Sequence, residues 1–391
     1  MKILVIFIDM LRMEQVFTPK EGWKNKDLEN MLEEMGGTLF SSCYTPGPDS
    51  YRSLGCFWSS KYPRDNGCIR RSTKTYDFLK NPELTWMGHL KKAGYCFNSY
   101  VGNYRNSHIP MFPNAYDKEV DNLSTGMFLN EWLPSLDIKD NSFTFISFSD
   151  LHDYLYDNYV TRKSFKKGVR FVTEMIQQFV KMFPLDMFDE TIIFSDHGFR
   201  FFFEENEYLL DERRSRIFLF WHHKNESTLR VDNTLRSIMD IYPTLLDLCS
   251  IAYDEDKIMG RNLFSTDGHE FLLFEEHAGY YSRFLEPICQ WAVVDNKNQF
   301  VFINDKMEWC DRKGRPIHEK YRIKYNDSLE QYMTNYKELR YMIKCDEQYK
   351  INENKMELAD FYTDGRKREK KKLSLLNRIK RKFITMAHRL G

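Results

Sequence analysis

Hydrophobic positions along the chain form two kinds of segment. Short, nearly continuous apolar runs such as KILVIFID (2–9) and SFTFISFSD (142–150) are typical of strands that are buried on both faces of a sheet. Between such runs, apolar residues recur every three or four positions, as in FKKGVRFVTEMIQQFVKMF (165–183), which predicts amphipathic helices. The alternation predicts an α/β sandwich with a mostly parallel central sheet and helices on both faces.

Three of the predicted strands end in acidic or histidine-bearing turns. These are Asp9; Asp150 with His152; and Asp196 with His197. In open α/β sheets, ligands bind at the carboxyl ends of the strands, so we expect these side chains at one edge. Two carboxylates and an imidazole there predict a divalent-cation site. Each aspartate could instead cap a following helix, but Gly198, which permits close approach of the backbone, favours function for the third turn.

A second cluster of polar residues lies in TPGPDSYRSLGCFWSSKYPRDNG (45–67). Ser50 precedes an apolar, helix-like stretch, and the start of a helix favours a bound anion. Arg52 could add a bidentate contact to an oxyanion. A serine between a cation and such an anion site can act as a nucleophile. The alternative is a capped helix with a solvated arginine.

The composition supports a folded body with a basic tail. The chain has 391 residues, of which 42% are hydrophobic, so a large core can form. Residues 366–391 hold 11 Lys and Arg against one acidic residue, and their apolar positions recur at helical spacing. We therefore expect a basic amphipathic helix at an anionic membrane surface. A solvated or partner-binding helix is the alternative, and nucleic-acid binding is not expected because the rest of the chain is acidic.

The same patterns suggest an organisation and a location. We predict a catalytic domain over 1–310, a helical or irregular extension over 311–365, and the basic helix over 366–391. The first apolar run is short and has no cleavage site, and no run is long enough to span a bilayer. The eight cysteines are scattered, which fits reduced thiols. These features predict a cytoplasmic protein that is peripheral at the inner face of the membrane.

Four segments carry a resemblance to the sulfatase branch of the alkaline phosphatase superfamily. ILVIFIDMLR (3–12) is similar to the first strand of that family with its metal-binding aspartate, and SDHG (195–198) resembles its second metal-binding strand end. SFSDLHDY (147–154) resembles a segment that reaches the substrate anion. The longest match is SIMDIYPTLLDLCSIAYDEDKIMGRNLF (237–264), which is similar to a late helix and the turn after it.

The resemblance implies roles for individual residues. The family's nucleophile lies eleven residues before a basic residue that precedes Tyr-Pro, which here points from Lys61 to Ser50. Arg52 and His152 would then contact phosphate or sulfate oxygens, and Lys61 and His277 are weaker candidates for substrate binding. The implied ligands of one divalent cation are Asp9, Ser50, Asp196 and His197.

Two departures from the family pattern affect the expected chemistry. Ser50-Tyr51-Arg52-Ser53-Leu54 lacks the proline and arginine that mark a nucleophile for conversion to formylglycine, so a plain serine and a phosphoserine intermediate are expected. Met10 replaces the second aspartate of the usual pair, which removes an oxygen ligand and favours one metal. Zn²⁺, Mn²⁺, Mg²⁺ and Ca²⁺ all remain compatible with such a mixed ligand set.

These observations lead to one functional hypothesis with two alternatives. The chain is expected to be a metal-dependent hydrolase or transferase that acts on phosphate or sulfate esters of small molecules, lipids or glycans through Ser50. Transfer of a phospho-substituent to a lipid-linked or surface glycan is the specific form that the basic tail favours. The alternatives are a sulfuric ester hydrolase, which needs a modified Ser50, and a catalytically inactive binding scaffold.

Overall fold

The protein is described by a computed structural model that covers most of the first 310 residues. The described residues are 1–68, 84–102, 122–123, 128–158, 160–199, 210, 212–278, 288–295, 300–303 and 309–310. The predicted extension 311–365 and basic helix 366–391 lie outside them, so both remain predictions. Apart from His277, every residue of the site below belongs to one of the two compact units into which the chain divides.

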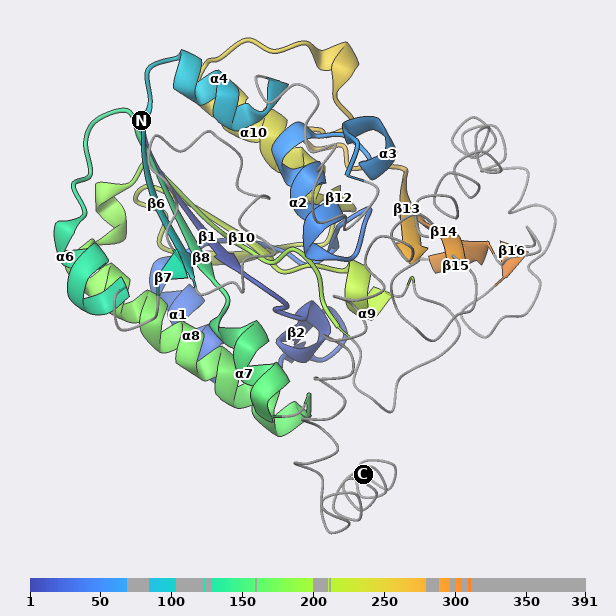
Figure 1. Cartoon of the computed structure of the whole chain (residues 1–391), viewed down its shortest axis with the longest axis horizontal. Coiled ribbons are helices and arrows are strands. Elements are labelled where there is room, and N and C mark those ends of the chain that lie inside the picture. The colour runs from blue at the N-terminus through green and yellow to red at the C-terminus, as the bar shows by residue number, and fades with distance from the viewer. Residues whose placement is uncertain are drawn as a thin grey trace, which may run out of the picture. The chain divides into compact units, whose positions relative to one another are not determined.

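A central sheet forms the core of the fold, as predicted, and it has eight strands (Figure 1). Its strand order is β11-β4-β10-β9-β1-β8-β6-β7, and β10 runs antiparallel to its neighbours β9 and β4. The bounds in that order are Leu229–Asp232, Gly37–Phe40, Leu219–His223, Glu190–Phe194, Lys2–Ile8, Ser142–Phe148, Cys96–Gly102 and Asn122–Leu123. The sheet is therefore mostly parallel, which requires helical crossovers on its faces.

Helices cover both faces of this sheet (Figure 1). One layer contains α1, α6, α7 and α8, and the other contains α2, α4 and α10. Their bounds are Lys26–Met35, Leu133–Ser135, Asp150–Asn158 and Arg162–Met182 for the first layer, and Ser50–Ser59, Trp86–Lys92 and Ile241–Leu248 for the second. The long helix predicted around 165–183 is α8, and its apolar stripe is buried.

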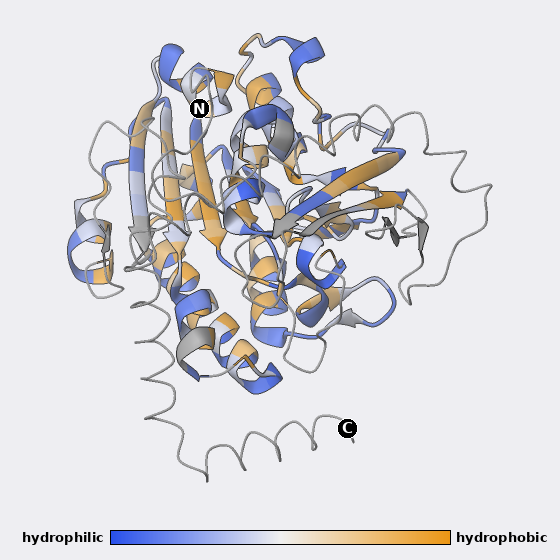
Figure 2. Ribbon diagram, turned by 45° about the vertical axis from the view of Figure 1, so that its right-hand side comes forward, coloured by the Kyte–Doolittle hydropathy of each residue, from blue (hydrophilic) through white to orange (hydrophobic). Residues whose placement is uncertain are grey.

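Large aromatic side chains fill the space between the sheet and α2. Phe57 of α2 stacks on Phe194 of β9 with ring centroids 4.4 Å apart, and Trp58 packs on Trp86 at 4.9 Å. The Trp86 indole N–H donates to the carbonyl of Phe57 at 2.9 Å, so the buried polar atom is satisfied. Figure 2 shows the hydrophobic colouring concentrated on the strands of the sheet. This packing fixes α2, and therefore the position of its first residue, Ser50.

Smaller elements complete the described chain. A separate four-stranded sheet has the order β13-β14-β15-β16, so these apolar strands do not extend the central sheet. Its strands are Phe271–Ala278, Ile288–Asp295, Phe300–Ile303 and Trp309–Cys310. The remaining elements are η1 Met13–Gln15, β2 Phe17–Thr18, β3 Gly22–Trp23, β5 Cys43–Tyr44, α3 Pro63–Asn66, η4 Phe128–Trp132, η5 Leu185–Met187, α9 Glu212–Ser215, β12 Arg236–Ser237, η7 Ile238–Asp240 and η8 Glu255–Lys257.

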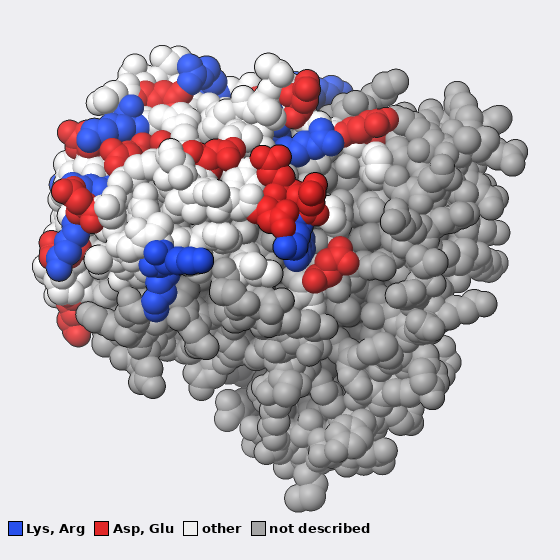
Figure 3. Space-filling model, turned by 90° about the horizontal axis from the view of Figure 1, so that it is seen from above, with Lys and Arg blue, Asp and Glu red and all other residues white. Residues whose placement is uncertain are grey.

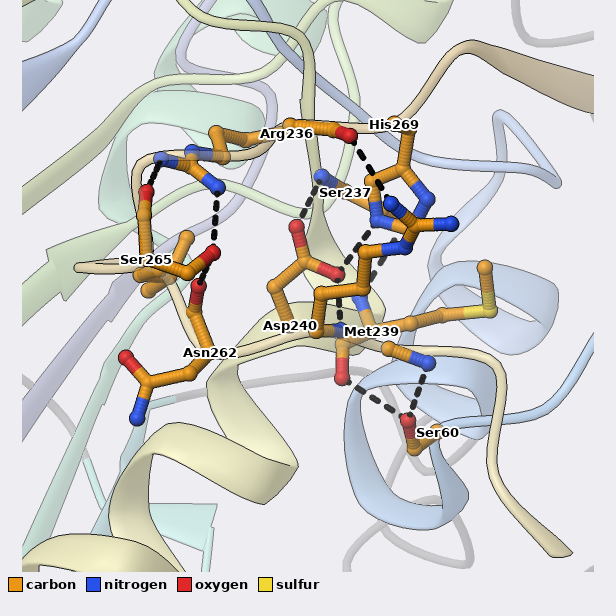
Figure 4. Close-up of polar contacts among 12 residues, drawn as sticks. Ser60, Arg236, Ser237, Met239, Asp240, Asn262, Ser265 and His269 are labelled. Atoms are coloured by element: carbon orange, nitrogen blue, oxygen red, sulfur yellow. Dashed lines mark hydrogen bonds and ion pairs between the residues drawn. The ribbon is translucent and has the colours of Figure 1, made fainter. Parts of the chain in front are cut away.

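A buried aspartate joins α10 to the loop that follows it. Asp240 accepts hydrogen bonds from the backbone N–H of Ser237 and of Arg261, both at 2.9 Å, and its Oδ1 lies 2.7 Å from Nε2 of His269 (Figure 4). Ser60 also joins this region, since its hydroxyl donates to the carbonyl of Met239 at 2.9 Å. The long segment that carried the family resemblance therefore has a structural role.

Two properties of the described surface bear on partners. Acidic and basic side chains are interspersed on the face that Figure 3 shows from above, where no single-sign basic patch forms among the described residues. Within the same described ranges, no helix combines the length and hydrophobicity that crossing a membrane requires.

Candidate active site

The carboxyl ends of three neighbouring strands meet at one edge of the sheet. Strand β1 pairs with β8 so that Ile8 lies opposite Phe148, and with β9 so that Phe7 lies opposite Phe194. The residues that follow these strands are therefore level with one another. The ligand atoms of Asp9, Asp196 and His197 lie within 4.8 Å of one another. The structure thus brings together the three residues that the sequence places at strand ends.

The two aspartates are fully buried, yet most of their oxygens lack hydrogen bonds. Asp196 Oδ1 accepts the backbone N–H of His197 at 2.8 Å and that of Met10 at 3.3 Å. Met10 adopts a left-handed backbone (φ 62°), a conformation that residues with a side chain rarely take and that is found at functional sites. In the part of the chain that is described, Asp196 Oδ2 and both oxygens of Asp9 accept no hydrogen bond.

These orphaned oxygens fit a divalent cation. Burial and the neighbouring charge of Asp196 raise the pKa of Asp9 to about 7, so the carboxylate pair is costly without a compensating positive charge. Buried polar atoms in native proteins generally have a protein, water or ion partner, and two adjacent carboxylates favour a cation as that partner. Asp9, Asp196 and His197 would hold such a cation with two carboxylates and one imidazole, a set that suits Zn²⁺, Mn²⁺, Mg²⁺ or Ca²⁺.

Ser50 lies beside this group as the first residue of α2. The cap of the helix is Asp49, whose Oδ1 accepts the backbone N–H of Arg52 at 2.9 Å, so Ser50 itself is free of the capping role. Ser50 Oγ lies 3.2 Å from Nε2 of His197. Nδ1 of His197 lies 2.6 Å from the carbonyl of Gly198 and must donate its proton there. Nε2 of the same ring also lies 3.4 Å from Oδ2 of Asp196, so this nitrogen faces both Ser50 and the carboxylate.

Further contacts fix α2 to the end of β9. The hydroxyl of Ser53 donates to the carbonyl of Asp196 at 2.6 Å and accepts from the hydroxyl of Thr45 at 2.8 Å. Gly198 is required for close approach, because a Cβ there would lie 2.1 Å from the carbonyl oxygen of Arg213. The nucleophile candidate and the metal-ligand candidates are thus held in one rigid assembly.

His152 lies in the first turn of α7, with Nδ1 3.1 Å from Oδ1 of Asp153. Burial alone would lower the pKa of His152, but the carboxylates of Asp9 and Asp153 outweigh that effect and raise it above the usual range. A cationic imidazole near the acidic group can attract a substrate oxyanion. Asp150 begins α7 instead, which is the helix-start alternative that the sequence left open.

The structure gives less support for three residues that were predicted to bind the substrate. The guanidinium of Arg52 is 3% exposed and forms ion pairs with Asp49 and Glu276. Lys61 follows the far end of the 10-residue α2, which spans about 15 Å at a helical rise of 1.5 Å per residue, so the structure does not bring it to Ser50. His277 belongs to β13, but its side chain lies outside the described residues.

The sequence reasoning missed several residues that support the site. Asp49 had a signal, because an aspartate before a helical stretch is a common cap. Asp153 and Ser53 lie inside segments that were singled out, but their contacts depend on the fold. Glu276 is 224 residues from Arg52, so no local pattern could have paired them.

Comparisons with known proteins support this picture. A family model described as Sulfatase matches residues 2–251, which is more than half of the chain, so the chain belongs to the sulfatase family. The family assignment confirms the predicted class, a sulfatase-like ester-hydrolysing enzyme. No curated protein sequence matches the chain.

Solved structures with low sequence identity share the fold. A 2-O GAG sulfatase is 13% identical with a TM-score of 0.59, and the alignment covers 89% of this chain and 94% of that one. A phosphonate monoester hydrolase from Silicibacter pomeroyi is 12% identical with a TM-score of 0.52, covering 87% and 95%. A protein in the alkaline phosphatase superfamily from Vibrio parahaemolyticus is 18% identical with a TM-score of 0.54, covering 81% and 82%. The predicted alkaline-phosphatase-like α/β fold is confirmed.

Proposed function

We propose that the protein is a metal-dependent hydrolase or transferase that acts on phosphate esters through Ser50. One observation carries the proposal: a serine hydroxyl at the start of α2 lies 3.2 Å from an imidazole nitrogen beside two buried carboxylates, three of whose oxygens accept no hydrogen bond in the described chain. A hydroxyl in such a setting suits nucleophilic attack rather than a structural role.

The residues of this chain would act in a defined order. The Ser50 hydroxyl releases its proton to solvent and its Oγ attacks phosphorus. The bond from phosphorus to the leaving oxygen breaks, and that oxygen takes the electron pair and a proton from solvent. His152 stabilises the negative charge on the oxygens that stay on phosphorus. A bound divalent cation would supply positive charge that favours the Ser50 alkoxide and polarises the ester. Water or an acceptor hydroxyl then attacks the phosphoserine and restores Ser50.

A sulfuric ester hydrolase is the second candidate. The family match and the shared fold of a 2-O GAG sulfatase favour it. This chemistry would need Ser50 to be converted to formylglycine, since an unmodified serine would retain sulfate as a stable ester. The surrounding Ser50-Tyr51-Arg52-Ser53-Leu54 lacks the proline and arginine of the conversion signal, and for that reason we place phosphate first.

The specific substrate is proposed from the composition of the tail. We propose a lipid-linked or surface glycan that receives a phospho-substituent, with residues 366–391 lying at the inner face of an anionic membrane. The support is the helical spacing and the strongly basic character of that segment. Flotation of the full chain with anionic or neutral vesicles tests it, and equal binding to both would contradict it.

Activity and mass spectrometry test the chemistry. Purified wild type and Ser50→Ala are assayed with aryl phosphate monoesters, aryl phosphodiesters and aryl sulfates, with Ser59→Ala at the other end of α2 as the matched control. We expect turnover of a phosphate ester that Ser50→Ala abolishes, and an unmodified, phosphate-labelled Ser50 peptide. Activity retained in Ser50→Ala contradicts the proposal, and a formylglycine mass at Ser50 favours the sulfatase alternative.

A further inference from the structure

A chain of buried charges lies directly behind Ser50. The guanidinium of Arg52 pairs with Oδ2 of Asp49 and with Oε1 of Glu276 on β13. The other oxygen of Glu276, Oε2, accepts from Nη1 of Arg214 at 3.0 Å. The side chains of Arg52 and Glu276 are 3% and 4% exposed, so both charges are removed from water and depend on their partners.

These charges hold the turn that leads into the helix. Nη2 of Arg214 donates to the carbonyl of Pro48 at 2.6 Å, and the backbone N–H of Glu275 donates to the carbonyl of Pro46 at 2.9 Å. Asp49 is fixed twice, because its Oδ1 caps the N–H of Arg52 while its Oδ2 pairs with the same residue's guanidinium. The turn 46–49 is therefore attached to β13 and to α9 immediately before Ser50.

We propose that Glu276 is a positioning residue that acts through Arg52 and Arg214 to fix the Ser50 end of α2. The inference rests on the proposed role of Ser50 as nucleophile. Arg52 then serves the geometry of the nucleophile and not the charge of the substrate. Two carboxylates, Asp49 and Glu276, already balance its charge through Nη2.

The two roles of Arg52 give opposite results when the charge of Glu276 is removed. Glu276→Gln keeps the shape of the side chain and its ability to hydrogen-bond. If Arg52 positions the helix, the turn loosens and turnover falls without any gain in anion binding. If Arg52 is reserved for the substrate, the loss of a competing carboxylate strengthens anion binding. Misplacement by about 1 Å can lower a rate about 10²-fold, so kcat is a sensitive readout.

The experiment compares Glu276→Gln with Glu190→Gln. Glu190 is also a buried glutamate of a sheet strand, but it bonds to Trp221 and His223 at the opposite edge of the sheet. For Glu276→Gln we expect kcat for the aryl ester that wild type turns over to fall about 10- to 100-fold with KM unchanged. Deuterium exchange should accelerate about 10-fold at residues 45–53, and Mn²⁺ affinity should not change. Glu190→Gln should change neither kcat nor exchange at 45–53.

Several results would overturn the proposal. Unchanged exchange at 45–53 in Glu276→Gln contradicts it, and so does a lower KM or tighter inhibition by vanadate. Deuterium exchange and Mn²⁺ binding can be measured without turnover, so they test the positioning role by themselves. If wild type hydrolyses none of the esters, that result counts against the proposed function alone. If Glu276→Gln does not fold, Arg214→Lys keeps the ion pair of Arg52 with Glu276 and weakens the contacts of Arg214 with Glu276 and Pro48. It should produce the same pattern of changes at smaller size.

Discussion

Two regions of this molecule bury aspartates equally and use them differently. Asp240 beside α10 and Asp9 at the end of β1 are both fully inaccessible to solvent. Asp240 accepts two backbone N–H groups and contacts the imidazole of His269 (Figure 4), whereas Asp9 accepts no hydrogen bond from the described chain. Burial alone therefore does not separate a structural carboxylate from a functional one, but the inventory of its partners does.

The negative charges of Asp240 and Asp9 are compensated in different ways. At Asp240 the positive ends of N–H dipoles compensate the carboxylate charge. These hydrogen bonds hold the loop after α10 in place, and the carboxylate requires no cation. At the strand ends, burial and then the neighbouring carboxylate of Asp196 raise the pKa of Asp9 to about 7. Protonation or a bound cation would relieve that repulsion, which is why we propose metal binding at this edge.

The largest expected effect comes from Asp196→Asn. The amide keeps an oxygen for the N–H groups of Met10 and His197 but loses the charge that a cation needs. We expect turnover to fall about 10³-fold, since a metal contributes several kcal/mol to such reactions, while the unfolding temperature of the metal-free protein does not decrease. Kinetics and metal analysis of the purified variant measure this. Stoichiometric metal with wild-type turnover would show that Asp196 is no ligand.

Asp9→Asn should stabilise the metal-free protein in a pH-dependent way. The folded pKa of Asp9 is about 7 against an ordinary value of 3.8, because burial, Asp196 and Asp153 together outweigh the favourable charges of His152 and His197. Stability from the protonated group is therefore present at low pH and is lost as pH rises through 7. At pH 8 we expect the variant to gain on the order of 3 kcal/mol over wild type.

Urea unfolding in chelator at several pH values checks the Asp9 prediction. The advantage of Asp9→Asn should grow between about pH 4 and pH 7 and then level off. Added Mn²⁺ should reverse the order, because only wild type gains from the cation. An advantage that is independent of pH would mean that the charge of Asp9 is not the cause.

Asp240→Ala should show the opposite pattern to the strand-end variants. Its removal leaves the N–H groups of Ser237 and Arg261 and the ring of His269 without their acceptor. We expect a loss of about 2–3 kcal/mol in the free energy of unfolding, with Mn²⁺ affinity and stoichiometry unchanged in the folded protein. Chemical denaturation and calorimetric titration measure the two quantities. Loss of Mn²⁺ binding without loss of stability would contradict the structural role of Asp240.

The smallest effect is expected for Ser53→Ala, with Ser59→Ala as its control. Both hydroxyls are buried in α2, but Ser53 donates to the carbonyl of Asp196 and Ser59 donates to Gly55 in its own helix. Each variant should lose about 1 kcal/mol of stability. Only Ser53→Ala should also reduce turnover, by a few fold, because it loosens the link between α2 and the turn that holds Asp196 and His197. Equal turnover in the two variants would contradict that link.

Parts of the site could be predicted because they follow from local patterns. Continuous apolar runs predicted the strands, and the parallel arrangement predicted that Asp9, Asp196 and His197 share an edge. Other features depended on distant residues. The antiparallel direction of β10 and the separate sheet of β13–β16 have no signature in the runs themselves, since apolar strands look alike in either direction.

The amino-acid sequence by itself determined which residue types end the strands, where α2 begins and that the chain belongs to a hydrolase class. Only the tertiary structure decided which of these residues have partners. In the folded chain Asp240 accepts hydrogen bonds, whereas Asp9 accepts none from the described residues. Folding also brings Arg52 into an ion pair with Glu276 of β13. The reason is physical: strand and helix formation follow short-range periodicity, whereas the energy of a buried charge depends on groups that only folding brings within hydrogen-bonding distance.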